Sequence, residues 1–154
     1  MRLSFLSLLA GCVVLLGPAA SAQDVTAEPT YGSESLDEGF LPDPYELDLT
    51  AGGSIAVDLG ACAYGHVAMA PDLDLYYTTS GNSDLYFFAV SGSDTMILVN
   101  TPSGDWLCDD DSYDDGDPLL VIPAAEDGLY NVWVGTYGED TAPATLFISE
   151  VDPR

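Results

Sequence analysis

The sequence predicts an all-β protein that folds as an antiparallel β-sandwich of about nine short strands. Apolar residues alternate with polar or acidic residues along several short segments, as they do in strands with one buried face. Clusters of Gly, Pro, Asn, Asp and Ser separate these segments at short intervals and indicate turns. No segment has the i, i+3, i+4, i+7 apolar spacing of an amphipathic helix over several turns.

The expected strands cover residues 45–49, 55–59, 73–79, 85–90, 96–99, 105–108, 119–122, 129–136 and 144–149. The first alternates apolar and acidic residues, and the second continues this alternation after the Gly52-Gly53 turn. Residues 85–90 are apolar throughout, which is typical of a central strand. The period of two then places Tyr86 and Phe88 on one face of that strand and Phe87 on the other.

Residues 1–22 have the pattern of a cleaved signal peptide: Arg2, an apolar run over residues 3–16, and a small-x-small motif at Ala20 and Ala22. The run is too short for a membrane span of about 20 residues. A lipobox ending at Cys12 is the alternative, and it would anchor the chain as a lipoprotein. Both patterns predict export to the periplasm or beyond. Residues 23–39 are polar, acidic and without periodicity, so we expect a flexible acidic leader before one β-sandwich domain over residues 40–152.

The charge is extremely one-sided. All 26 acids follow residue 22, whereas one of the two basic residues, Arg2, precedes it, so residues 23–154 carry a formal charge of −25. Such a field repels nucleic acids and anionic lipids, so neither is expected as a partner. A saline habitat, where salt screens the self-repulsion, would also explain the acidity.

Cleavage of the signal peptide would leave two cysteines, Cys62 and Cys108. In an exported chain such a pair predicts a disulfide. The two residues are 46 positions apart, and closing a loop of that length stabilises by roughly 4 kcal/mol in the chain-entropy model. A reactive or metal-binding thiol pair is the weaker alternative, because there is neither a C-x-x-C spacing nor a basic neighbour.

The segment over residues 109–117 holds six aspartates. Carboxylates packed this closely repel one another unless a cation neutralises them. Calcium takes about six to eight oxygen ligands, so it is the candidate ion, and no other cofactor is predicted. The candidate calcium ligands are Asp94, which could reach the same end of the sandwich, and Asp109, Asp110, Asp111, Asp114, Asp115 and Asp117. The alternative is a solvated acidic loop.

Four aromatic residues are candidates for a recognition surface: Trp106, Trp133, Tyr113 and Tyr137. In the expected strand over residues 129–136, Asn131 shares a face with Trp133 and indicates that this face is the less buried one. Sugar-binding sandwiches use such aromatic platforms, so a carbohydrate- or cell-surface-binding module is an alternative function. Packing in or beside the core is the simpler explanation of the same residues.

No catalytic constellation emerges. His66 is the only histidine, and the Gly-x-Ser-x-Gly elbow that would supply it with a nucleophile is absent from the sequence. With 26 acids, any chosen pair of carboxylates carries no meaning without geometry. The sequence therefore predicts a protein that is not an enzyme.

Several segments together carry a resemblance to a known family: residues 39–44 (GFLPDP), Cys62 with residues 71–72 (PD), residues 94–100 (DTMILVN), 102–106 (PSGDW), 108–111 (CDDD), 128–137 (GLYNVWVGTY) and 144–150 (ATLFISE). Over residues 39–151 the chain resembles bacterial pre-peptidase C-terminal domains. The resemblance implies a jelly-roll-like sandwich, usually appended to secreted proteases and other exported enzymes. It implies roles in secretion, stability or surface binding, with calcium in some members. No peptidase precedes the module here, so we expect a stand-alone exported form.

The sequence thus predicts a non-catalytic exported accessory or binding module. Its expected partner is a protein or a polysaccharide at the cell envelope.

Overall fold

The computed structural model describes residues 22–113 and 116–154. The expected signal peptide and Cys12 lie outside the described residues, except for Ala22. The described part forms eleven strands: β1 (Ser33–Asp37), β2 (Tyr45–Ala51), β3 (Ile55–Ala56), β4 (His66–Val67), β5 (Leu73–Thr78), β6 (Leu85–Ser91), β7 (Thr95–Asn100), β8 (Trp106–Asp109), β9 (Leu119–Ile122), β10 (Gly128–Thr136) and β11 (Ala142–Ser149). The all-β class is confirmed.

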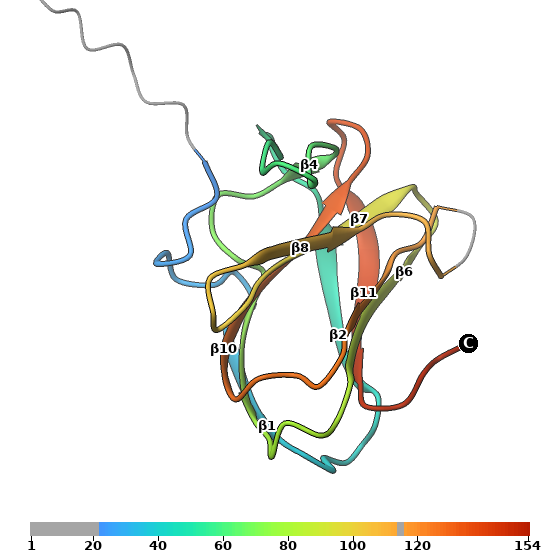
Figure 1. Cartoon of the computed structure of the whole chain (residues 1–154). Coiled ribbons are helices and arrows are strands. Elements are labelled where there is room, and N and C mark those ends of the chain that lie inside the picture. Colours follow the sequence, from blue (N-terminus) through green and yellow to red (C-terminus); the bar gives the residue numbers. More distant parts are fainter. Residues whose placement is uncertain (1–21, 114–115) are drawn as a thin grey trace, which may run out of the picture.

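The strands form two sheets that face each other as a sandwich (Figure 1). In the seven-stranded sheet, β10 pairs with β5 and β4 along one edge and with β7 along the other. Strands β1, β3 and β8 extend this sheet beyond β5, β4 and β7. The four-stranded sheet has the order β2-β11-β6-β9. The strands pair antiparallel except β1 and β5, which run parallel, and the jelly-roll description stays a prediction.

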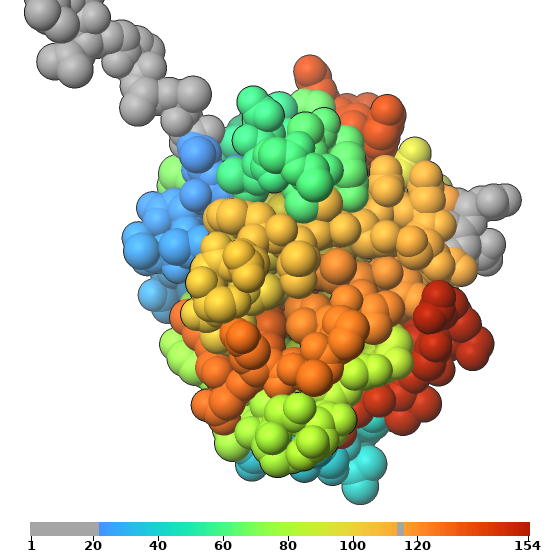
Figure 2. Space-filling view, in the orientation of Figure 1, coloured from blue at the N-terminus to red at the C-terminus, as the bar shows by residue number. Residues whose placement is uncertain are grey.

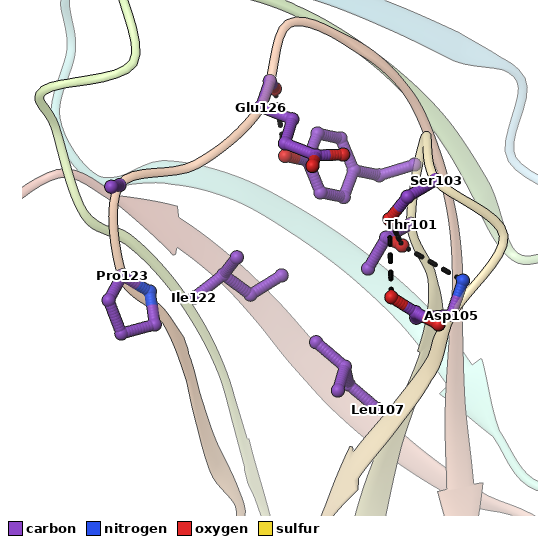
Figure 3. Close-up of a pocket in the computed structure, with 9 residues that line it drawn as sticks. Thr101, Ser103, Asp105, Leu107, Ile122, Pro123 and Glu126 are labelled. Atoms are coloured by element: carbon purple, nitrogen blue, oxygen red, sulfur yellow. Dashed lines mark hydrogen bonds between the residues drawn. The ribbon is translucent and has the colours of Figure 1, made fainter.

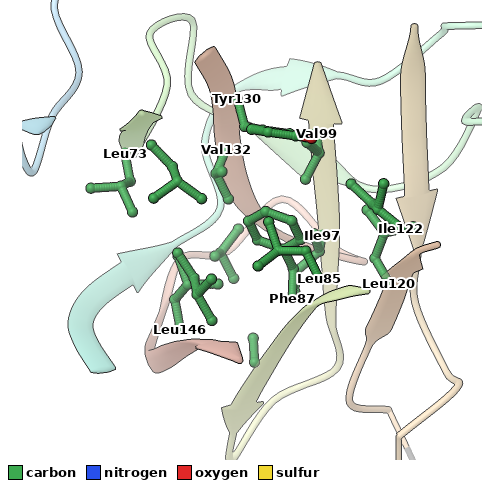
Figure 4. Packing of buried hydrophobic residues seen from close by; sticks show 14 of the residues in the cluster. Leu73, Leu85, Phe87, Ile97, Val99, Leu120, Ile122, Tyr130, Val132 and Leu146 are labelled. Carbon is green, nitrogen blue, oxygen red and sulfur yellow. The ribbon is translucent and has the colours of Figure 1, made fainter. Parts of the chain in front are cut away.

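The main core lies between the sheets and uses the faces that the alternation predicts. Phe87 of β6 points into it, while Tyr86 and Phe88 lie on the outer face of the same strand, as predicted. Strand β6 is central, because it pairs with both β11 and β9. Figure 4 shows Phe87 packed near Ile97 of the facing sheet. Burial of each such side chain stabilises the fold by about 1.5–3 kcal/mol.

The outer face of β10 is also buried. Trp133 has an exposed fraction of 0% and packs in a second cluster with Met96, Leu98 and Cys62. The segment over residues 57–66 covers this face, and in Figure 2 the green chain around residue 60 lies against the yellow β7–β8 region. The face shared by Leu129, Asn131 and Trp133 was predicted to be the less buried one. This holds only at Leu129, which is half-buried, whereas Asn131 and Trp133 are covered. A loop far away in the sequence supplies the cover of Trp133.

The segment predicted to be a flexible leader differs from the expectation. It contains β1, which pairs with β5 from Ser33 opposite Asp74 to Asp37 opposite Thr78. Before β1, the Thr30 and Tyr31 N–H groups donate to the carbonyls of residues 71 and 72, at 2.8 Å each. Backbone hydrogen bonds hold this segment, and they need no apolar periodicity in the side chains.

The expected strand over residues 55–59 is shorter than predicted. Strand β3 ends at Ala56, and the chain then makes an isolated bridge between Leu59 and Cys62 before β4, which the sequence does not predict. The described residues contain no helix long and apolar enough to cross a membrane.

Candidate functional site

The predicted disulfide between Cys62 and Cys108 is present, with the two Cα atoms 5.8 Å apart. It joins the segment over residues 57–66 to β8, across the cluster that buries Trp133. Trp106 lies beside this cluster, with its ring centroid 5.4 Å from that of Trp133. The bridge therefore holds the cover of the outer sheet face in place.

The acidic segment starts at the last residue of β8, Asp109. The Asp109 carboxylate accepts hydrogen bonds from the Ser112 N–H (3.0 Å), the Ser112 hydroxyl (2.6 Å) and the Leu119 N–H (2.8 Å). Tyr113 packs on Phe88, with ring centroids 5.1 Å apart. The described part of this loop is thus folded against the outer face of the four-stranded sheet.

Asp94 lies beside the same loop, as predicted. The N–H of its neighbour Thr95 donates to the Gly116 carbonyl (2.9 Å), and a Cβ placed on Gly116 would lie 3.5 Å from the Asp94 Cα. Burial raises the pKa of Asp110, and the charges of the nearby aspartates raise it further, Asp94 among them. The structure therefore brings the β7 start and the loop into one negative region.

Tyr64 borders this negative region from the loop that carries Cys62. Burial raises the pKa of Tyr64 to about 12, and the charges of Asp110, Asp109 and Asp111 act in the same direction. Its phenol is therefore neutral at physiological pH.

Within residues 22–113 and 116–154, no group of three or more His, Cys, Asp or Glu side chains is arranged to hold a metal ion. The Asp109 carboxylate is engaged as described, and Asp117 Oδ1 accepts the Ser91 N–H at 3.1 Å. Two of the seven predicted ligands, Asp114 and Asp115, lie outside the described residues. Calcium binding at this loop stays a prediction.

The four candidate recognition aromatics do not gather on one surface. Trp133 is fully buried and Trp106 packs against it with the rings tilted by 41°, so Trp133 is not available to a glycan. Tyr113 packs on the opposite side of the sandwich, against Phe88. Tyr137, with 58% of its surface exposed, is the one freely accessible member of the set. The simpler explanation of packing holds for the two tryptophans.

His66 lines a cavity of about 470 Å³ next to Ser54 and Glu139. These residue types could form a nucleophile, a base and an orienting acid. However, the His66 Nδ1 atom is buried and has no hydrogen-bond partner among the described residues.

A buried carboxyl that the sequence analysis missed lies at the start of β5. Asp72 is 3% exposed, and its Oδ2 accepts the Val134 N–H at 2.8 Å. Burial raises its pKa to about 7, and the hydrogen bond from Val134 opposes this shift. The alternation pattern does not mark Asp72, because the residue precedes the expected strand. The Asp72 side chain thus connects the start of β5 to β10 and is buried, whereas most aspartates face solvent.

A second cavity, of about 200 Å³, opens between the turn over residues 101–105 and the turn that follows β9 (Figure 3). Asp105 and Glu126 contribute carboxylates, and Leu107 and Ile122 contribute apolar surface between the turns. The remaining lining residues are Thr101, Ser103, Pro123, Ala124 and Tyr130. The sequence analysis assigned none of these residues to a site, because they come from three separate stretches of the chain, 101–107, 122–126 and Tyr130.

These features define an all-β protein with two facing sheets, a disulfide-pinned outer cluster and a strongly acidic surface. Comparison with protein-family models and with curated proteins finds no match. Among solved structures, the chain is similar to PliG of Aeromonas hydrophila, a periplasmic lysozyme inhibitor of g-type lysozyme. The TM-score is 0.42 with 12% sequence identity, over 80% of this chain and 98% of that chain. A likeness at this level assigns no function.

Proposed function

We propose that this chain is an exported, non-catalytic β-sandwich that binds a positively charged protein. One observation carries the proposal: residues 23–154 hold 26 acids and a single basic residue. A surface of one sign selects partners of the opposite sign and speeds their association. It also disfavours nucleic acids and anionic membranes as partners.

The chain does not neutralise its own charge. Its C-terminal residue, Arg154, forms an ion pair with Asp152 at 3.0 Å, two positions away. That ion pair neutralises one of the 26 acids, and the negative electrostatic field of the other acids remains. At physiological ionic strength the field decays over about 8 Å, so it acts on a partner only at close range.

Export and a non-catalytic role belong to this proposal. The pattern over residues 1–22 supports export, and the Cys62–Cys108 disulfide suits an oxidising compartment. The non-catalytic role is supported by the sequence, in which His66 is the only histidine and no Gly-x-Ser-x-Gly elbow occurs. Membership of the pre-peptidase C-terminal family is part of the proposal too, and the segments over residues 94–111 and 128–150 support it.

The test is a binding titration against basic proteins at about 0.15 M salt, where exposed charges are screened beyond about 8 Å. A lysozyme serves as one probe, and the same lysozyme with acetylated lysines is its matched control. We expect saturable binding to the basic form, weaker binding at higher salt, and loss of binding to the acetylated form. A lysozyme activity assay in the same series measures inhibition directly. If a panel of basic exported proteins shows no binding even at low salt, the proposal is wrong.

A further inference from the structure

We propose that the cavity between the turn over residues 101–105 and the turn after β9 holds a lysine or arginine side chain of the partner protein. This inference rests on the proposed function and names the type of residue through which a basic partner is held. The occupant follows from the charge of the rim, the chemistry of the floor and the size of the cavity.

The rim carries two carboxylates from different turns. Asp105 Oδ2 accepts a hydrogen bond from the Ser103 hydroxyl at 3.3 Å, and the Asp105 side chain lines the cavity. Glu126 lines the other side of the cavity (Figure 3). A cationic side chain between the two turns would have a carboxylate on either wall, and a contact with either one would be a charge-assisted hydrogen bond.

The floor is apolar. Leu107 of β8, Ile122 of β9 and the fully buried Tyr130 of β10 all line the cavity. The Tyr130 hydroxyl donates to the Glu126 carbonyl at 2.8 Å, so its proton is already engaged. A floor of hydrocarbon under a charged rim matches a lysine or arginine side chain, which has an aliphatic stem and a cationic head.

Both walls are held in place by hydrogen bonds that do not involve the two carboxylates at the rim. On one wall, the Asp105 N–H donates to Thr101 Oγ1 at 3.1 Å. On the other, the Ala124 N–H donates to Asp84 Oδ1 at 2.9 Å. The turn over residues 101–105 also packs against the start of β10, because a Cβ placed on Gly128 would lie 2.8 Å from the Pro102 Cβ. Prior ordering of this kind lowers the entropic cost of binding.

The volume of the cavity favours a single amino-acid side chain over a larger ligand. About 200 Å³ is less than the roughly 300–1,000 Å³ typical of cavities that bury a drug-sized ligand, so it suits one side chain. Calcium would need about six to eight oxygen ligands, which a half-apolar lining does not supply. The cation has to come from another molecule, since Arg154 is the one Lys or Arg of residues 23–154 and it already pairs with Asp152.

The experiment follows amide chemical shifts of the exported chain by NMR while Nα-acetyl-lysine N-methylamide is added. The corresponding norleucine compound, which has the stem without the charge, is the matched ligand control. We expect saturable shifts around residues 101–107 and 122–130 with the lysine compound and none with the norleucine compound. In a double variant, Asp105→Asn with Glu126→Gln, the affinity should fall about tenfold, which is about 1.4 kcal/mol. Both replacements keep the size of the side chain, so this variant should remain folded.

The control protein variant is Glu139→Gln with Asp140→Asn, which removes two exposed acids beyond the opposite end of β10. Its affinity should change by no more than about twofold, as expected for exposed charges at a distance. Equal losses in the two variants, or equal shifts with the norleucine compound, would overturn the inference. Binding of the lysine compound here without binding of any basic protein would leave the cavity assigned and refute the proposed function. If the Asp105→Asn, Glu126→Gln variant bound a basic protein as tightly as the wild type, the proposed function would stand and the assignment of the cavity would be refuted.

Discussion

The replacement Asp72→Asn should abolish one component of the pH dependence of stability. Asp72 is 3% exposed, and its pKa in the fold is about 7, against an ordinary value of 3.8. Because the pKa is higher in the fold than in the unfolded chain, the folded state favours the protonated carboxyl. The stabilisation is therefore complete below about pH 4 and is lost as the pH rises through about 7.

The magnitude follows from the shift. One pKa unit corresponds to about 1.36 kcal/mol, so a shift from 3.8 to about 7 gives a limit of about 4 kcal/mol once Asp72 is ionised. This is a large fraction of the roughly 5–15 kcal/mol that stabilises a typical domain. In the variant, the carbonyl of the introduced amide can still accept the Val134 N–H, whereas the new NH₂ group adds a cost that does not depend on pH. The informative quantity is thus the change of the stability difference with pH, not its absolute value.

The assay is urea unfolding followed by the fluorescence of the buried Trp133, between about pH 4 and pH 9. The free energy of unfolding of Asp72→Asn relative to the wild type should rise by up to about 4 kcal/mol across this range. The exposed Asp140→Asn variant removes the same charge and should show only the small slope that reduced self-repulsion produces. A stability difference between wild type and Asp72→Asn that is constant with pH would refute the argument that burial sets this pKa.

Three further predictions concern the outer cluster and the acidic loop. Replacing Cys62 and Cys108 together by serine should cost about 4 kcal/mol, read from the urea midpoint, and a loss below about 1 kcal/mol would show that the loop stays closed without the bridge. Trp133→Ala should lower the free energy of unfolding by about 3–5 kcal/mol, whereas exposed Tyr137→Ala should cost less than about 0.5 kcal/mol; similar costs would contradict the burial of Trp133. Calcium added after EDTA treatment should raise the melting temperature, by the equivalent of about 2.7 kcal/mol at 100 times Kd, and Asp110→Asn should reduce this shift. An unchanged melting temperature at millimolar calcium would refute calcium binding at this loop.

The strands could be predicted because each has a local signal. Alternation along residues 45–49 and the apolar run over residues 85–90 lead directly to β2 and β6, and the two faces of β6 follow from the period of two. The Cys62–Cys108 pairing could be predicted because only two cysteines remain after the expected signal peptide. In each case the information lies within a few residues or in a simple count.

The rest depends on contacts between distant segments. Strand β1 pairs with β5 through backbone hydrogen bonds. Such bonds need no apolar periodicity in the side chains, so the polar sequence of β1 does not mark it as a strand. Trp133 looks half-exposed from its neighbour Asn131, but the loop around Cys62 covers it from about 70 positions away in the sequence. The cavity at Asp105 and Glu126 needs the meeting of β8 with β9, which no local pattern encodes.

Charge links the stability of the fold to the proposed partner. Rising pH both ionises Asp72 in its buried position and completes the ionisation of the exposed acids, so the two effects destabilise the free chain in the same direction. A basic protein that binds only the folded state would stabilise it by RT ln(1 + [L]/Kd), and it would offset part of the repulsion among the exposed acids but not the burial of the Asp72 charge. Melting curves with the partner at several pH values therefore separate the two contributions. The partner should shift both wild type and Asp72→Asn upward by equal amounts, because Asp72 is buried between β5 and β10 and is out of reach of a partner at the surface.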